Sequence, residues 1–323
     1  MKIITNFALC NFYLMTLQQL EYIVAVDKHH HFARAAEECG VTQPTLSAML
    51  AKLEAELGVK LFVRSSQQVV TTDVGRQIVL QASKVLASAH RIPEIAAENL
   101  GSLSGTFRIG ILPTIAPYLL PLFFPQLLRD HPEMGIRVVE MRTAEIRRAL
   151  EVGEIDAAIV VRLQELEAYR LTTLYYEQFL AYVSQNDPLF KRDSIRSTDL
   201  RDEFVWLLDE GHCFRDQLVK FCQIRSARSS KAAYSLGSIE TFMRMVEMGR
   251  GITFIPELAV SQLTNDQRKL VRPFAIPIPT REVVMMTTDS FVRKSVLEHV
   301  CNAIRSAVPQ QLLQFNNTKH RLL

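Results

Sequence analysis

The chain has 323 residues, of which 48% are hydrophobic and 22% charged, so it is long enough for two or three globular domains. Its net charge of +3 does not by itself identify a nucleic-acid-binding protein, so that function must be carried by a motif. Five scattered cysteines do not form a secreted disulfide framework, and no apolar run reaches the roughly 18 residues of a membrane span. We therefore expect a cytoplasmic protein without a membrane partner, with residues 1–14 as an extension before a second possible start at Met15.

A helix-turn-helix pattern occupies residues 15–74. Apolar spacing predicts three helices and a β-hairpin, or wing, over residues 16–26, 31–39, 43–57 and 62–71. Gly40 supplies a stop for the second helix. Thr42 is a suitable N-cap for the third helix, and Pro44 fits its first turn. A helix, a tight turn with glycine and a second helix with a polar start are typical of DNA-reading modules.

The same stretch resembles the DNA-binding module of LysR-type transcriptional regulators. The matching residues are dense and correctly spaced: Phe32, Ala35, Ala36, 41–47, Leu53, Glu54, Leu57, Gly58, Leu61, Phe62, Arg64, Thr72 and Gly75. The resemblance implies that the third helix enters the major groove of double-stranded promoter DNA. It implies DNA contacts from Thr42, Gln43, Pro44, Thr45, Ser47, Lys52 and Arg64. Residues 15–74 carry five basic and seven acidic side chains, so we expect modest affinity per module and a need for dimeric binding.

A long helix is predicted from residue 72 to about residue 100, because this stretch has only one glycine and one proline and a heptad-like apolar spacing. Packing on its own domain is one explanation of the apolar seam. The family resemblance favours the other, pairing with a second copy in a homodimer or homotetramer. We place a linker and dimerisation segment at 75–103, with a hinge at 100–105.

The regulatory half, residues 104–309, alternates short apolar runs with amphipathic segments. This alternation predicts a doubly wound α/β layout with a largely parallel sheet. The predicted elements include a strand at 204–208, a returning strand at 281–286 and a last helix at 295–307. The resemblance implies two α/β lobes of the periplasmic-binding-protein-like architecture, with a site between the lobes. Residues 310–323 are expected to form a flexible tail.

The trigger segment, residues 211–222, places Cys213 and Cys222 nine positions apart after a predicted strand. Cys213 would lie at the start of a helix, where the helix dipole, His212 and Arg215 favour its thiolate. A thiolate attacks peroxide to give a sulfenic acid, which a second thiol converts to a disulfide. A helix would hold the two cysteines about 13 Å apart, whereas a disulfide needs Cα atoms within about 7 Å. Any bridge between them would therefore require the helix to unwind.

The trigger segment and the turn at 112–121 are similar to the redox site of peroxide-sensing members of the LysR-type family. By position, the resemblance implies that Cys213 is the peroxidatic cysteine and Cys222 the resolving cysteine of a reversible disulfide. It implies a peroxide site formed by Thr114, Thr143, His212 and Arg281, with Arg215 and Asp216 completing the redox segment. The implied partners are hydrogen peroxide, a thiol reductant and RNA polymerase. Neither a cofactor nor a metal is expected.

Alternatives stay open from the sequence. The chain could be a metabolite-responsive LysR-type regulator without redox chemistry, in which Cys213 and Cys222 are two unrelated buried cysteines. It could be a thiol peroxidase, although a multiple-turnover enzyme has no need of a helix-turn-helix. That helix-turn-helix could also serve only for protein contact. Thr114 and Thr143 could simply cap helices, because both fall at strand-to-helix turns.

Overall fold

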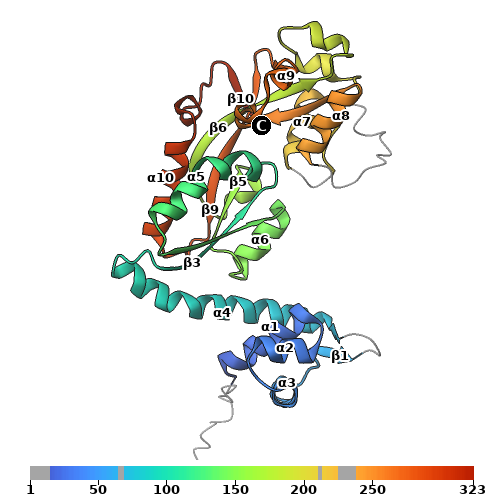
Figure 1. Cartoon of the computed structure of the whole chain (residues 1–323). Coiled ribbons are helices and arrows are strands. Elements are labelled where there is room, and N and C mark those ends of the chain that lie inside the picture. Colours follow the sequence, from blue (N-terminus) through green and yellow to red (C-terminus); the bar gives the residue numbers. More distant parts are fainter. Residues whose placement is uncertain (1–14, 65–68, 210–212, 225–237) are drawn as a thin grey trace, which may run out of the picture. The chain divides into compact units, whose positions relative to one another are not determined.

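The structure is a computed structural model that describes residues 15–64, 69–209, 213–224 and 238–323. The predicted extension 1–14 and His212 therefore lie outside the described residues. The chain forms two compact units that divide between Glu94 and Ile95, within helix α4 (Figure 1). Within the described ranges, no helix is both long enough and apolar enough to cross a membrane.

The first unit is a winged helix-turn-helix. Its elements are α1 (Leu17–His29), α2 (Phe32–Glu38), α3 (Gln43–Leu57), β1 (Phe62–Arg64), β2 (Val69–Thr71) and the first part of α4 (Asp73–Asn99). The two strands pair antiparallel, as predicted for the wing. The apolar faces of the helices meet in one small core that includes Ile23, Leu46 and Leu53.

Local signals in the sequence explain where the helices of this unit begin and end. Thr42 is the N-cap of α3, with its hydroxyl accepting from the Thr45 N–H, and proline occupies the first turn. Gly58 ends α3 in the left-handed conformation with φ 70°. Gly75 lies so close to the first wing strand that a Cβ would be 2.2 Å from the Leu61 carbonyl oxygen. A larger residue at position 75 would therefore push α4 away from the wing.

The second unit is a two-lobed α/β domain. Its elements are β3 (Gly105–Ile111), α5 (Ala116–Asp130), β4 (Met134–Glu140), α6 (Thr143–Glu151), β5 (Ala157–Val161), β6 (Arg170–Val183), α7 (Cys213–Cys222), α8 (Ile239–Met248), β7 (Ile252–Pro256), α9 (Asn265–Arg268), β8 (Val271–Pro273), β9 (Ile278–Thr287), α10 (Lys294–Ala307) and β10 (His320–Leu322). The strand order is β4-β3-β5-β9-β6-β7, with β10 beside β9 and β8 beside β6. The long strands β6 and β9 connect the two lobes (Figure 1).

The sheet of this unit is mixed, whereas the sequence predicted a largely parallel one. β3 runs parallel to β4 and β5, as expected of βαβ connections. β9, however, is antiparallel to both β5 and β6, because the chain returns through it after forming the second lobe. β7 and β8 are antiparallel to β6 as well. The two-lobed architecture was predicted correctly, but four of the seven strand pairings among the described residues of this unit are antiparallel, two of them through the returning strand β9.

Two further predictions about this unit are wrong. The run 204–208 forms only an isolated bridge between Val205 and Ile252, because the Trp206 carbonyl is taken by the hydroxyl of Thr253. The tail from residue 310 is not loose, since β10 pairs in parallel with Ile278–Thr280 of β9. This end of β9 extends past its pairing with β5, so β10 covers backbone groups that would otherwise form an open edge.

The predicted hinge is attached to the second unit. The guanidinium of Arg293 donates to the carbonyls of Leu103, Ser104 and Thr106. At the end of α4, the Glu98 carboxylate accepts from the backbone N–H and hydroxyl of Ser295. The division of the chain therefore falls within α4, a few residues earlier than the sequence suggested.

Candidate redox site and nucleic-acid interface

The predicted DNA contacts lie mostly on the exposed N-terminal part of α3. Thr42, Gln43, Pro44 and Thr45 are exposed and Ser47 is half-buried, while Lys52 is exposed near Glu56 of the same helix at 3.9 Å. The Thr42 and Thr45 hydroxyls are 2.8 Å apart and serve the helix cap. Arg64 is the last residue of β1. This end of α3 presents short polar side chains at the positive end of the helix dipole, a combination suited to phosphate and base contacts.

Several acidic side chains of the first unit have structural roles. The buried Glu54 carboxylate accepts from the Leu61 N–H at 2.8 Å and pairs with Lys60 at 2.6 Å, which fixes the start of the wing. Glu38 pairs with Lys28 at 2.8 Å, and this hydrogen-bonded contact lowers the pKa of the Glu38 carboxyl. Because each of these carboxylates pairs with a lysine, the pairing leaves the acidic excess of the module unchanged, and the expectation of modest DNA affinity per module stands.

The candidate redox site is a small cavity at the start of α7. It has a volume of about 10 Å³, which is about the space that one water molecule requires. Its walls come from the turn after β3, the start of α6 and the start of α7, and they comprise Leu112, Pro113, Thr114, Arg142, Thr143, Cys213 and Phe214. The sequence-predicted residues Thr114, Thr143 and Cys213 are therefore brought together from three separate segments.

Arg281 of β9 reaches Thr114 at this site and is buried. Its Nη1 donates to the Thr114 hydroxyl at 3.2 Å and its Nη2 to the Thr114 carbonyl at 3.0 Å. Glu177 of β6, also buried, accepts from Nε at 2.9 Å and from Nη2 at 2.6 Å. The rings of Phe179 and Phe214 lie 5.7 and 5.4 Å from the guanidinium carbon. The guanidinium is therefore held on several sides.

The environment of Cys213 differs from the one predicted. Burial raises the pKa of the Cys213 thiol, and this effect outweighs the charge of Arg281 and a hydrogen bond with Thr143, both of which lower it. In this closed arrangement the thiol form of Cys213 is favoured, whereas the sequence predicted a thiolate partly through His212, which lies outside the described residues. Arg215 forms an ion pair with Asp216 at 3.5 Å, so the nearby cation that acts on Cys213 is Arg281 instead.

Cys222 lies at the far end of the same helix. Both Cys213 and Cys222 are free thiols, and α7 runs without interruption between them. The Cys222 side chain is buried, and burial raises the pKa of its thiol to about 12. A nine-residue separation at about 1.5 Å per residue places the two thiols far beyond bridging distance, as predicted.

Helix capping does not explain the two threonines. The N-cap of α5 is Ile115 and the N-cap of α6 is Arg142, so neither Thr114 nor Thr143 occupies the capping position. Thr114 is buried and its hydroxyl accepts from Arg281, while Thr143 opens α6 with its side chain at the cavity. Both side chains therefore face the redox site.

Sequence reasoning missed Glu177 and the packing role of Phe214. A charged residue just before the apolar run of β6 was a signal for Glu177, because a carboxylate there requires a buried partner. Its partner Arg281 is 104 positions away, and no spacing rule connects them.

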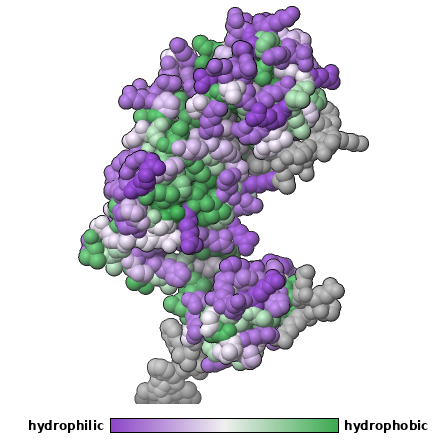
Figure 2. All heavy atoms as spheres, viewed as in Figure 1, coloured by the Kyte–Doolittle hydropathy of each residue, from purple (hydrophilic) through white to green (hydrophobic). Residues whose placement is uncertain are grey.

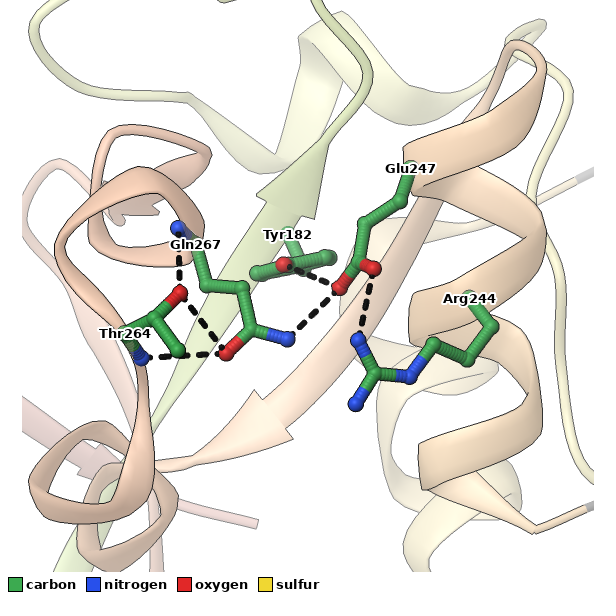
Figure 3. A network of polar contacts seen from close by, with 5 residues as sticks. All are labelled: Tyr182, Arg244, Glu247, Thr264 and Gln267. Atoms are coloured by element: carbon green, nitrogen blue, oxygen red, sulfur yellow. Dashed lines mark hydrogen bonds and ion pairs between the residues drawn. The ribbon is translucent and has the colours of Figure 1, made fainter.

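A second hollow, of about 360 Å³, lies beside α8 and α9. Its polar groups are engaged with one another: the Glu247 carboxylate accepts from Tyr182 at 2.8 Å, Gln267 at 2.9 Å and Arg244 at 2.8 Å (Figure 3). The visible surface near α9 is largely hydrophilic (Figure 2). The described residues that line this hollow include no cysteine, so the network is better explained as packing of the second lobe than as a redox site.

Two family models match the chain. Residues 17–76 match the bacterial regulatory helix-turn-helix protein, lysR family, and residues 100–309 match the LysR substrate binding domain. The hydrogen peroxide-inducible genes activator of Haemophilus influenzae is 35% identical over 296 residues, which cover 91% of this chain and 97% of that protein.

Solved structures are similar over most of the chain. A full-length OxyR variant from Pseudomonas aeruginosa is 37% identical, with a TM-score of 0.74, over 91% of this chain and 99% of that one. An OxyR mutant from Corynebacterium glutamicum, described as H2O2-bound, is 29% identical, with a TM-score of 0.60, over 90% of this chain and 92% of that one. Together with the winged helix-turn-helix and the two-lobed domain, these matches show that the chain belongs to the LysR family of bacterial helix-turn-helix regulators.

Proposed function

We propose that this LysR-family protein is a hydrogen-peroxide-sensing transcriptional regulator of oxidative-stress genes, and that Cys213 is the residue that peroxide oxidises. The observation that carries the proposal is the cavity of about 10 Å³ in which Cys213 meets Thr114 and Thr143 beside the buried Arg281. Hydrogen peroxide is among the smallest oxidants that such a space could admit. The names of the relatives, which refer to hydrogen peroxide, support the same conclusion.

The proposed chemistry uses only groups at the site and the two cysteines. The sulfur of Cys213 attacks one peroxide oxygen, so an S–O bond forms as the O–O bond breaks. Sulfur is oxidised to a sulfenic acid, and the leaving hydroxide takes up the thiol proton and departs as water. The charge of Arg281 and the hydroxyls of Thr114 and Thr143 stabilise the oxygen that gains negative charge. The Cys222 thiol then attacks the sulfenic sulfur, a disulfide forms, and a second water leaves.

Formation of this disulfide would act as a switch because α7 cannot stay helical across it. We propose that the remodelled second unit changes DNA binding or transcription through a homodimer or homotetramer. Ile92 and Ile95 on α4 are 70% and 54% exposed, which supports pairing with a second copy. Double-stranded promoter DNA, RNA polymerase and a thiol reductant that resets the switch are the further partners, in the cytoplasm. Each protein molecule would be oxidised once per signal, unlike a multiple-turnover enzyme.

The proposal is tested by mapping the thiols of the full-length reduced protein before and after equimolar hydrogen peroxide. Samples are alkylated and digested without reductant. The expected product is a Cys213–Cys222 disulfide that reductant removes, while Cys301 stays a thiol. Cys213→Ser should abolish peroxide-dependent transcription in vitro, whereas Cys301→Ser, at another buried cysteine, should not. An unchanged Cys213 thiol, or wild-type signalling from Cys213→Ser, would refute the proposal.

Binding of a metabolite at the Cys213 cavity, as a regulator without redox chemistry would require there, is disfavoured by the volume of that cavity. Pockets for small molecules usually measure about 300–1,000 Å³, and the Cys213 cavity is far smaller. Arg281 and Glu177 together occupy the space where the strands connecting the two lobes meet. A response that survived replacement of both cysteines, with a small molecule raising the melting temperature, would favour that alternative.

A further inference from the structure

The orientation of Arg281 is fixed by Glu177 on one side and by Thr114 on the other. A guanidinium has five N–H groups. Glu177 accepts from Nε and Nη2, and Thr114 accepts from Nη2 and Nη1. Among the described residues, these contacts leave one N–H, and it belongs to Nη1. That nitrogen is the one beside the Thr114 hydroxyl, which lines the Cys213 cavity.

Glu177 is suited to hold this arrangement. Its carboxylate is buried and is the counter-ion of a guanidinium that is itself buried. One oxygen, Oε1, accepts both of its bonds from Arg281, while Oε2 faces the Leu258 N–H of the second lobe at 3.4 Å. A buried arginine that lost this counter-ion would be strongly destabilised and would seek water or another acceptor. The position of Nη1 beside the Thr114 hydroxyl, which lines the cavity, therefore depends on Glu177.

We propose that Glu177 is a positioning residue for peroxide reduction, which holds Arg281 so that its remaining Nη1 N–H faces the cavity beside Thr114 and Cys213. The inference rests on the proposed function. Glu177 does not touch peroxide; it acts through Arg281. The Nη1 N–H would donate to the peroxide oxygen that leaves as hydroxide, where negative charge develops as the O–O bond breaks. Because preorganised donors act only if they are already in place, a small displacement of Arg281 would slow the reaction.

The test compares two reactions of Cys213 in the full-length reduced protein. Oxidation by hydrogen peroxide needs stabilisation of a leaving hydroxide, whereas alkylation by iodoacetamide needs only the thiolate. Both rate constants are measured by quenching and peptide mass mapping across a pH series, and their ratio is taken where the thiolate is fully formed. Glu177→Gln should lower this ratio at least tenfold. Glu257→Gln, at a neighbouring carboxylate that faces the Gln178 N–H, should leave it within twofold.

If Glu177 had only a structural role, its replacement would lower the melting temperature or change both rate constants together, and the ratio of the two rate constants would not change. An unchanged ratio in folded Glu177→Gln therefore overturns the proposal. If Glu177→Gln does not fold, Glu177→Asp is used, because it keeps the charge but withdraws the carboxylate from Arg281. An unchanged ratio in folded Glu177→Asp also overturns the proposal. If wild-type Cys213 is not oxidised by peroxide, the proposed function itself fails, and the two failures are thereby distinguished.

Discussion

The distance between the two cysteines makes opening of α7 the step that should limit disulfide formation. The helix spans Cys213–Cys222, so its rise of about 1.5 Å per residue separates the thiols by about 13 Å, nearly twice the maximum Cα separation of about 7 Å. Burial also raises the pKa of the Cys222 thiol to about 12 from its ordinary 9.0. The Cys222 thiolate is then roughly 1,000-fold rarer in the closed helix than in an opened chain at neutral pH. Closure must therefore wait until the helix opens.

Phe221→Ala should accelerate closure by weakening the closed helix. The ring of Phe221 packs edge-on against Phe274, with centroids 6.1 Å apart, and is partly buried. Truncating a fully buried phenylalanine costs about 3–5 kcal/mol, so about 2 kcal/mol is reasonable for this half-buried one. If the contact is lost on opening, the opening equilibrium rises roughly 30-fold, at about 1.4 kcal/mol per factor of ten. Oxidation of Cys213 should stay within twofold, because Phe221 does not line the cavity.

The assay mixes reduced protein rapidly with equimolar peroxide and quenches samples with acid at intervals. Mass spectrometry then measures the sulfenic acid, trapped by dimedone, separately from the disulfide. Phe190→Ala is the control, since Phe190 is also partly buried in the second lobe but packs on Arg272. Equal acceleration in Phe190→Ala would show only general destabilisation. Unchanged closure in Phe221→Ala would refute the argument that helix opening limits the reaction.

Three further predictions concern pH and DNA binding. The pKa of Cys222 is about 12 in the folded protein and near 9 in the unfolded chain. Burial of the neutral thiol therefore stabilises the reduced protein fully below pH 9, and this contribution is lost as the pH rises toward 12. Between pH 8 and pH 11, chemical denaturation should therefore show a fall in the free energy of unfolding that is about 2.5 kcal/mol smaller for Cys222→Ala than for wild type. Oxidation of Cys213 by peroxide should accelerate between pH 7 and 9, because burial raises the pKa of that thiol; a flat rate profile would contradict this. Lys52→Ala should weaken binding to all DNA sequences and reduce the salt slope by about one, measured by fluorescence anisotropy, whereas an unchanged slope would place Lys52 away from phosphates.

The parts that the sequence predicted well are those controlled by neighbouring residues. The start of α3, for example, follows from Thr42 and Pro44. The parts that it missed depend on residues far apart in the chain. The pairing of β10 with β9 and the burial of Glu177 against Arg281 are decided by which strand edge is open and which charge lacks a partner. The pKa of Cys213 belongs to the same class, because burial is a property of the whole fold.

The same long-range contacts suggest how a change at one sulfur reaches both lobes. Phe214 follows Cys213 in α7, and its ring packs on Phe179 with centroids 5.0 Å apart and lies over Arg281. Unwinding α7 to reach Cys222 would have to withdraw this ring, because Phe214 lies between the two cysteines. Arg281 would keep its hydrogen bonds to Glu177 but would lose the packing of the Phe214 ring. This loss would weaken the hydrogen bonds between Arg281 and Thr114 of the first lobe. Since β9 carries Arg281 and connects the lobes, a local disulfide would become a change in how the lobes are held together.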